Sequence, residues 1–249
     1  MTSQKHREFY GLGQDRRTLN GIPEWEAIHR DQSWGRWPSE QFVRFASPRA
    51  PEPEVGRGDI HIPPRVVELG CGAGAQLRLL IELGFEVVGL DISPTAIEKA
   101  KSLLGLAIGS RAEVSVFDLT TGLPFEDGSV DGIVDVQCLM CFPWEIALAI
   151  MSECTRVLKP GGWLYSECIG AETDVGGEPS ARVGEWKNTI IEGRVRNRFL
   201  RTTTKSEITS LMEGLQIDKV DRVTYETVGG CDWVGERFVS YVVHARKAG

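Results

Sequence analysis

VVELGCGAGA, residues 66–75, is the stretch that decides the fold. It reads as a short buried strand that runs directly into three glycines, Gly70, Gly72 and Gly74. Glycines at a turn from strand to helix let the backbone approach a ligand closely and adopt angles that side chains forbid. The stretch therefore predicts a nucleotide-binding turn, although Gly70, Gly72 and Ala75 also match the dinucleotide pattern G-x-G-x-x-G/A.

From residue 65 onward, short β-branched runs alternate with helical patterns, which is typical of βαβ units in a parallel sheet. We expect strands near 65–69, 86–90, 112–117, 131–136 and 161–167, with helices near 74–83, 94–104 and 143–157. The long connection 170–203 carries several glycines and is expected either to have a function or to contain a helix of its own. A helix at 205–215 and two strands at 216–226 and 237–246 follow, paired antiparallel because only a loop separates them.

The chain divides near Pro63-Pro64. We predict that residues 1–62 form an aromatic-rich helical lid, which includes Trp34, and a linker rich in proline and glycine, whereas residues 63–249 form one globular domain. A helix through 38–46 would place Phe42 and Phe45 on one side and Arg44 on another. This helix would either cover the edge of the sheet, with Trp34 and Trp37 as core anchors, or act as a working lid.

A second motif, VVGLDISP, ends an apolar strand in Asp91, about twenty residues after the glycines. A carboxylate there can accept hydrogen bonds from ribose hydroxyls. The competing structural role, capping the next helix, is better filled by Ser93 ahead of Pro94. Nicotinamide-binding proteins also place a carboxylate here, so this motif alone leaves the cofactor open.

Four blocks together are more specific: VVELGCGAGA, VVGLDISPTAIEKA, VFDLTTGLPFEDGSVDGIV and RVLKPGGWLYSE. With them the chain resembles the class I S-adenosylmethionine-dependent methyltransferases, especially small-molecule enzymes similar to those of quinone biosynthesis. The resemblance implies an α/β fold with a seven-stranded Rossmann-like sheet, strand order 3-2-1-4-5-7-6 and strand 7 antiparallel, with helices on both faces and an N-terminal helical lid. It also implies S-adenosylmethionine as cofactor and S-adenosylhomocysteine as product.

The resemblance implies a set of cofactor-binding positions: Glu68, Gly70, Cys71, Gly72, Asp91, Ile92, Asp118, Leu119, Asp135, Gln137, Trp37 and Arg44. Glu68 would lie at the methionine end, Asp91 at the ribose and Asp118 at the adenine. Many relatives carry a His pair after the fourth strand, where this chain reads DVQCLMC. A catalytic histidine is therefore not transferred, and Trp37 and Arg44 are candidates to close over the methionine carboxylate.

The composition of the chain limits the classes of partner that we expect for the protein. The net charge of −7 offers no basic surface for a phosphate backbone, which argues against nucleic acid and favours a small-molecule acceptor. The sequence lacks a long apolar run and a secretory pattern, so we expect a cytoplasmic protein without membrane contact, possibly a homodimer. The six cysteines are expected to be free thiols, and the lone C-x-x-C of Cys138 and Cys141 to line the core and hold no metal.

Methyl transfer from a sulfonium is an in-line displacement that depends mainly on alignment and exclusion of water, so no catalytic residue is predicted. His29 and His61 are expected to be exposed without function. Solvent exposure on a helix is the commoner explanation for a cluster of arginines, and contact with a carboxylate or phosphate of the acceptor is the alternative: Arg194, Arg196, Arg198 and Arg201. Three alternatives stay open: a nicotinamide-dependent oxidoreductase, a non-catalytic methyltransferase-like binding protein, and an enzyme acting on protein or RNA.

Overall fold

A computed structural model describes residues 22–31, 36–52, 62–180, 182–191, 194–196, 199–226 and 237–249. Trp34, His61, Arg198 and Cys231 lie outside these residues. The chain forms two compact units, Met1–Glu126 and Asp127–Gly249. The boundary expected near residue 63 stays a prediction.

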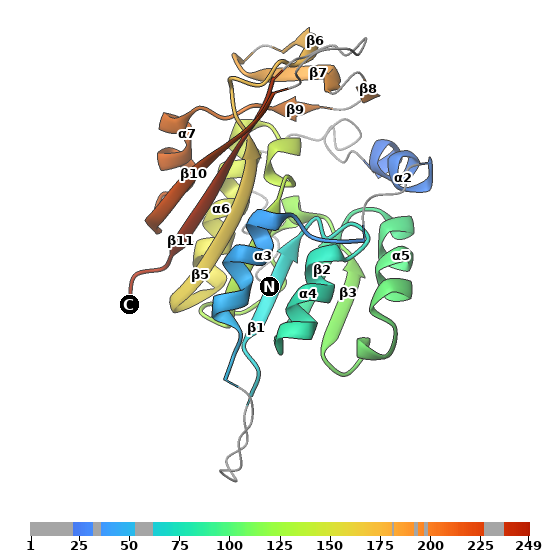
Figure 1. The fold of residues 1–249 in the computed structure, drawn as a ribbon, viewed down its shortest axis with the longest axis vertical. Coiled ribbons are helices and arrows are strands. Elements are labelled where there is room, and N and C mark those ends of the chain that lie inside the picture. Colours follow the sequence, from blue (N-terminus) through green and yellow to red (C-terminus); the bar gives the residue numbers. More distant parts are fainter. Residues whose placement is uncertain are drawn as a thin grey trace. The chain divides into compact units, whose positions relative to one another are not determined.

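The first unit contains three parallel strands with the helices that connect and precede them (Figure 1). Its strands are β1 (Arg65–Leu69), β2 (Glu86–Asp91) and β3 (Ala112–Val116). Its α-helices are α2 (Ile22–Asp31), α3 (Glu40–Ala46), α4 (Ala75–Leu83) and α5 (Pro94–Leu104), and its 3-10 helices are η1 (Ser47–Arg49), η2 (Gly105–Ala107) and η3 (Leu119–Thr121). Phe42 and Phe45 of α3 are both buried, which confirms that they share the apolar side of that helix.

The second unit begins with β4 (Val130–Val136), η4 (Leu139–Cys141), α6 (Trp144–Val157) and β5 (Leu158–Ile169). It ends with α7 (Lys205–Leu211), β10 (Gln216–Glu226) and β11 (Arg237–Arg246). Strand β11 pairs antiparallel with both β5 and β10, and β4 pairs parallel with β5.

The main sheet has seven strands in the order β10-β11-β5-β4-β1-β2-β3. Numbered by chain order within this sheet alone, that is the predicted order 3-2-1-4-5-7-6, and β11 is the antiparallel seventh strand. The predicted fold class is therefore confirmed. Apolar strands such as β2, whose last five residues are all buried, build its core.

The connection after β5 forms a second, small sheet made of β6 (Gly176–Pro179), β7 (Glu185–Ile191), β8 (Arg194–Arg196) and β9 (Leu200–Arg201). All of its strands pair antiparallel. The chain returns to the end of β5 through Thr203, whose backbone N–H donates to the Ile169 carbonyl at 2.8 Å. The described part of the connection thus contains strands, and the helix that was one expectation for it is absent from that part.

Gly89, in the middle of β2, makes room for the glycine turn. A Cβ at this position would lie 2.5 Å from Leu77 Cδ1 and 2.8 Å from Cys71 Sγ. We therefore expect Gly89→Ala to lower the free energy of unfolding by about 1–3 kcal/mol, and Gly89→Val to lower it further. Urea unfolding of the two variants measures this, and an alanine variant as stable as the wild type would show that Leu77 and Cys71 have space to move.

Candidate functional site

The turn after β1 is held in a ligand-binding shape by backbone hydrogen bonds. Gly70 and Gly72 have φ values of 61° and 52°, in the left-handed region that disfavours other residues. The Cys71 N–H donates to the Leu90 carbonyl at 3.0 Å, which fixes the turn against the end of β2. These residues form the strand-to-helix turn that the sequence predicts.

Asp91, the last residue of β2, connects this turn to the start of α5. Its Oδ2 accepts from the Gly72 N–H and its Oδ1 from the Ser93 N–H, both at 2.9 Å. The Ser93 hydroxyl in turn accepts from the Ala96 N–H at 3.1 Å and caps α5, as predicted. Because each carboxylate oxygen can accept more than one hydrogen bond, Asp91 keeps acceptor capacity for a ligand hydroxyl.

Two further residues of the turn are deeply buried. Glu68 is 1% exposed at the end of β1, and Cys71 is 3% exposed. Burial, together with the negative charges of Glu68 and Asp91, raises the pKa of the Cys71 thiol well above its usual range. The thiol is therefore protonated at neutral pH, so Cys71 contributes its backbone and bulk to the site and is no nucleophile.

The end of β3 lies against the same residues. The Phe117 N–H donates to the Asp91 carbonyl at 2.8 Å. Asp118 Oδ1 accepts from the backbone N–H and the hydroxyl of Thr120, at 3.0 and 2.7 Å, and so caps η3. Leu119 is buried and Ile92 is half-buried. One Asp118 oxygen is thus used locally, and a contact of Asp118 or the Leu119 amide with adenine stays a prediction.

In the second unit, Asp135 organises the segment after β4. Its Oδ1 accepts from the N–H groups of Cys138 and Leu139 at 2.9 and 3.0 Å, and its Oδ2 from the Ser166 hydroxyl at 2.6 Å. Burial raises the pKa of Asp135, opposed by these hydrogen bonds. Its carboxyl group therefore serves the fold of this segment.

Gln137 has a φ of 59°, the positive value of a non-glycine residue that is uncommon in proteins. Its N–H donates to the Glu167 carbonyl at 2.9 Å, which ties the strained residue to β5. Strained residues of this kind cluster at functional sites. The predicted contact of Gln137 with the cofactor is compatible with this geometry.

Arg201 is fully buried, which corrects the expectation of a solvent-exposed arginine. Its Nε donates to the Phe142 carbonyl at 3.4 Å, its Nη1 to the Thr203 hydroxyl at 3.1 Å and its Nη2 to the Leu139 carbonyl at 3.4 Å. Its guanidinium carbon lies 5.1 Å from the centre of the Trp144 ring, and burial lowers its pKa. Arg201 thus holds η4 in place from β9.

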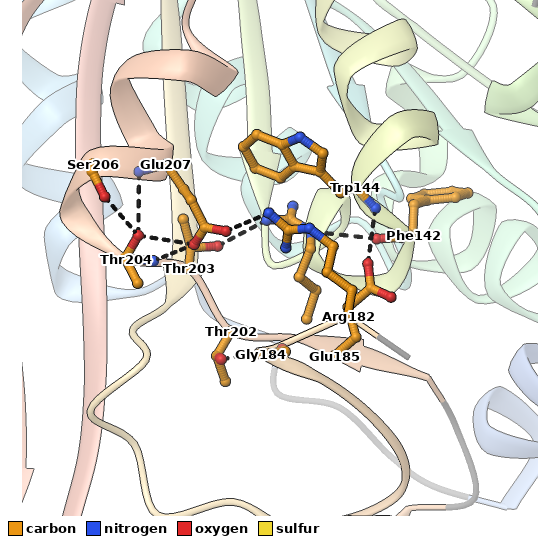
Figure 2. A network of polar contacts seen from close by, with 11 residues as sticks. Phe142, Trp144, Arg182, Gly184, Glu185, Thr202, Thr203, Thr204, Ser206 and Glu207 are labelled. Carbon is orange, nitrogen blue, oxygen red and sulfur yellow. Dashed lines mark hydrogen bonds and ion pairs between the residues drawn. The ribbon is translucent and has the colours of Figure 1, made fainter. Parts of the chain in front are cut away.

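Around Trp144, a polar network joins the small sheet to α6 and α7 (Figure 2). Arg182 lies over the Trp144 ring at 4.6 Å and pairs with Glu207 at 2.6 Å. The Glu185 carboxylate accepts a hydrogen bond from the backbone N–H of Trp144 at 3.1 Å. The network gives the connection after β5 a fixed place next to the segment that Asp135 organises.

The two N-terminal candidates lie at the surface. Trp37 is 70% exposed and stacks on Arg78 of α4, with 4.5 Å from the guanidinium carbon to the ring centre. Arg44 pairs with Glu40 one turn away in α3, at 2.6 Å, and its side chain is 77% exposed. Their proposed closure over a methionine carboxylate stays a prediction that this packing does not support.

The helix that covers the glycine turn is α2, and sequence reasoning missed its role. Glu26 accepts from the Ser93 hydroxyl at 2.6 Å and from the Thr95 N–H at 3.1 Å. His29 is 5% exposed, which corrects the expectation of an exposed histidine. The clue available in the sequence was weak: a carboxylate and a histidine three residues apart on one helix face.

Glu26 makes the packing of α2 sensitive to acid. Hydrogen bonds from Ser93 and Thr95 lower its pKa from 4.5 to about 2. Since the pKa falls on folding, the carboxylate stabilises the fold fully above pH 4.5, and this contribution disappears as the pH falls toward 2. We expect wild type to exceed Glu26→Gln in unfolding free energy at pH 6 and the difference to shrink on acidification. A constant difference down to pH 2 would contradict it.

The described cysteines Cys71, Cys138, Cys141, Cys154 and Cys168 are free, as predicted. Burial raises the pKa of the Cys168 thiol to about 12. Within the described part of the chain, no group of three or more His, Cys, Asp and Glu side chains is arranged to hold a metal. The same residues include no helix with the length and apolar character needed to cross a membrane.

The glycine turn lies within a stretch of the chain that is similar to known methyltransferases. A family model described as a methyltransferase domain matches residues 66–162. The chain is also 25% identical over 173 residues to a ubiquinone biosynthesis O-methyltransferase from Burkholderia ambifaria, covering 66% of this chain and 70% of that relative. Over these residues the predicted resemblance to the class I S-adenosylmethionine-dependent methyltransferases is confirmed.

Other proteins that the chain resembles are named for different acceptors. The chain is 26% identical over 117 residues to an 18S rRNA (guanine-N(7))-methyltransferase from Schizosaccharomyces pombe, covering 46% of this chain and 41% of that relative. A structure of 1,6-didemethyltoxoflavin-N1-methyltransferase from Burkholderia thailandensis, with its substrate and S-adenosylhomocysteine bound, has a TM-score of 0.58 at 18% identity, covering 91% of this chain and 87% of that chain. The fold is therefore shared across acceptors, and the rRNA relative means that acidic net charge does not settle the acceptor class.

Proposed function

We propose that this methyltransferase moves the methyl group of S-adenosylmethionine to a small-molecule acceptor. The observation that carries the proposal is the joining of Gly72 and Asp91 by a 2.9 Å hydrogen bond. It holds the glycine turn and a buried carboxylate together at the ends of β1 and β2, where open α/β sheets bind nucleotides. A small-molecule acceptor is supported by the match to the ubiquinone biosynthesis enzyme and by the net charge of −7.

In this proposal the first unit binds the cofactor. Glu68 lies at the methionine end, the backbone of Gly70, Cys71 and Gly72 lines methionine and ribose, and Asp91 with Ile92 holds the ribose hydroxyls. Asp118 and the Leu119 amide face the adenine. Asp135 and Gln137, which lie in the second unit, stay predicted cofactor-binding residues, and the Asp135 carboxylate shapes the backbone of the segment after β4.

The chemistry needs little from side chains. The cofactor supplies an activated methyl group, and transfer requires an acceptor atom in line with the breaking carbon–sulfur bond. The buried side chains of Asp135 and Arg201 hydrogen-bond to the backbone of the segment after β4. In our proposal these bonds fix the position of that segment, and fixed positioning is what an in-line displacement requires.

Transfer from S-adenosylmethionine with a radioactive methyl group tests the acceptor class. We would offer the purified protein three kinds of acceptor: a panel of phenols and hydroquinones, total ribosomal RNA, and a cell lysate freed of small molecules. Label in the small-molecule fraction, lost in Asp91→Ala, supports the proposal. Label only in RNA or protein would overturn the small-molecule acceptor while preserving the methyltransferase.

A second candidate, RNA methylation, is favoured only by the relative from Schizosaccharomyces pombe, of which the chain spans 41%. Contacts with phosphate groups make RNA binding strongly dependent on salt. If the protein methylates RNA, the amount of label in RNA should therefore fall steeply between about 50 and 200 mM salt.

A further inference from the structure

The N-terminal helix α2 is hydrogen-bonded at two points to α5, once at the start of α5 and once in its middle. At the first, the Glu26 carboxylate accepts from Ser93 and Thr95, including the hydroxyl groups of both. At the second, Lys99 Nζ donates to the backbone carbonyl of His29. Two anchors about one helical turn apart fix both the position of α2 and its rotation about its own axis.

This rotation places the His29 ring directly over the glycine turn. A Cβ built on Gly72 would lie 3.5 Å from His29 Cε1, an ordinary van der Waals distance. The Gly72 N–H donates to Asp91 at 2.9 Å, so the imidazole, the turn and the carboxylate meet in one place. With 5% of its surface exposed, His29 is enclosed there.

The surroundings of His29 favour an uncharged ring. Desolvation by burial and the nearby Lys99 lower its pKa, against the opposing charges of Asp91 and Glu26. A neutral imidazole carries one donor and one acceptor nitrogen. Such a ring suits hydroxyl groups, whereas a pyrophosphate at a glycine turn is better matched by cationic groups and free N–H donors.

We propose that His29 is a cofactor-contacting residue, which α2 holds over the glycine turn so that its ring binds the ribose of the nucleoside together with Asp91. The inference rests on the proposed function, since it concerns the same nucleoside site. It assigns the N-terminal helix a direct part in cofactor affinity, through a residue separated from the turn by about 40 positions in the chain.

Calorimetric titration with S-adenosylhomocysteine tests the contact. We expect His29→Phe, which keeps a flat ring without nitrogens, to weaken binding about tenfold, the loss expected for one hydrogen bond. His29→Gln, which retains a donor and an acceptor, should recover part of the affinity. The matched control is His244→Phe in β11, whose ring lies beside Tyr165 at 5.7 Å, and its affinity should equal the wild type.

A second ligand locates the contact on the nucleoside. 5′-Methylthioadenosine keeps the ribose and lacks the amino-acid part, so His29→Phe should weaken its binding by the same factor. A loss seen with S-adenosylhomocysteine alone would place His29 at the amino-acid end and overturn the ribose assignment.

Ligand-free thermal unfolding separates contact from folding. His29→Phe with a wild-type melting temperature and tenfold weaker binding supports the inference. Wild-type affinity in His29→Phe overturns it while the proposed function stands. The inference is also overturned if His29→Phe lowers the melting temperature and His29→Gln loses as much affinity as His29→Phe. A structural role of His29 would then explain the loss of affinity. Wild-type protein that binds neither ligand overturns the proposed function itself.

Discussion

Asp91→Ala should weaken the binding of S-adenosylhomocysteine by about 10–150-fold, which corresponds to roughly 1.5–3 kcal/mol for hydrogen bonds to a charged carboxylate. The physical reason is that Asp91, only 6% exposed, is the buried acceptor joined to the glycine turn. Asp91→Asn, which keeps the size and one acceptor oxygen of the side chain, should show an intermediate loss. Isothermal titration calorimetry measures all three proteins.

The control for this prediction is Glu98→Ala, in the same helix that follows Asp91. Glu98 forms an exposed pair with Lys101 at 2.9 Å, and its side chain is 72% exposed. Its removal should leave cofactor affinity unchanged. If Asp91→Ala bound S-adenosylhomocysteine as tightly as the wild type, the assignment of Asp91 to the ribose would be wrong.

Arg201→Ala should lower the free energy of unfolding by about 3–5 kcal/mol. The substitution leaves a cavity in a buried site and removes the donors that face the carbonyl groups of Leu139 and Phe142. It also removes the guanidinium that lies over the Trp144 ring. Chemical denaturation monitored by tryptophan fluorescence measures the loss.

Arg44→Ala is the matched control for Arg201→Ala, because Arg44 lies in an exposed pair on α3. Surface substitutions of this kind change stability by within about 0.5 kcal/mol. If the two variants were equally stable, the Arg201 hydrogen bonds, two of which are 3.4 Å long, would only offset the cost of burying the guanidinium charge and would add no net stability.

The cofactor half of the site was predictable because its elements are local in sequence. A buried strand, a glycine turn and a helix appear as one continuous pattern, and an apolar strand ending in Asp91 follows at the usual distance. The Ser93 cap could be predicted for the same reason, since capping involves neighbouring residues only. The order of the main strands was predicted from the family resemblance, whereas the antiparallel pairing of the last two strands followed from the loop between them.

The remaining features depend on contacts between distant segments. Glu26 accepts a hydrogen bond from Ser93, which lies 67 positions later in the chain, and nothing in the sequence around Glu26 predicts that partner. The small sheet after β5 consists of short, irregular strands without a clear alternating pattern. Arginine is rarely fully buried, so composition favoured the wrong environment for Arg201.

The structure also changes which N-terminal residues are candidates for cofactor binding. Trp37 and Arg44 were chosen by analogy with relatives, yet Trp37 rests on Arg78 and Arg44 on Glu40 at the surface. His29 lies against Gly72 instead. Our proposal therefore assigns the N-terminal contribution to cofactor binding to α2, one helix before α3.

Titration of the purified wild-type protein with S-adenosylhomocysteine, in parallel with NADH, tests the central claim most directly. We predict micromolar binding of S-adenosylhomocysteine and no heat from NADH, because the stretch that matches a methyltransferase domain includes both the glycine turn and Asp91. Binding of NADH without any response to S-adenosylhomocysteine would contradict the account and favour an oxidoreductase.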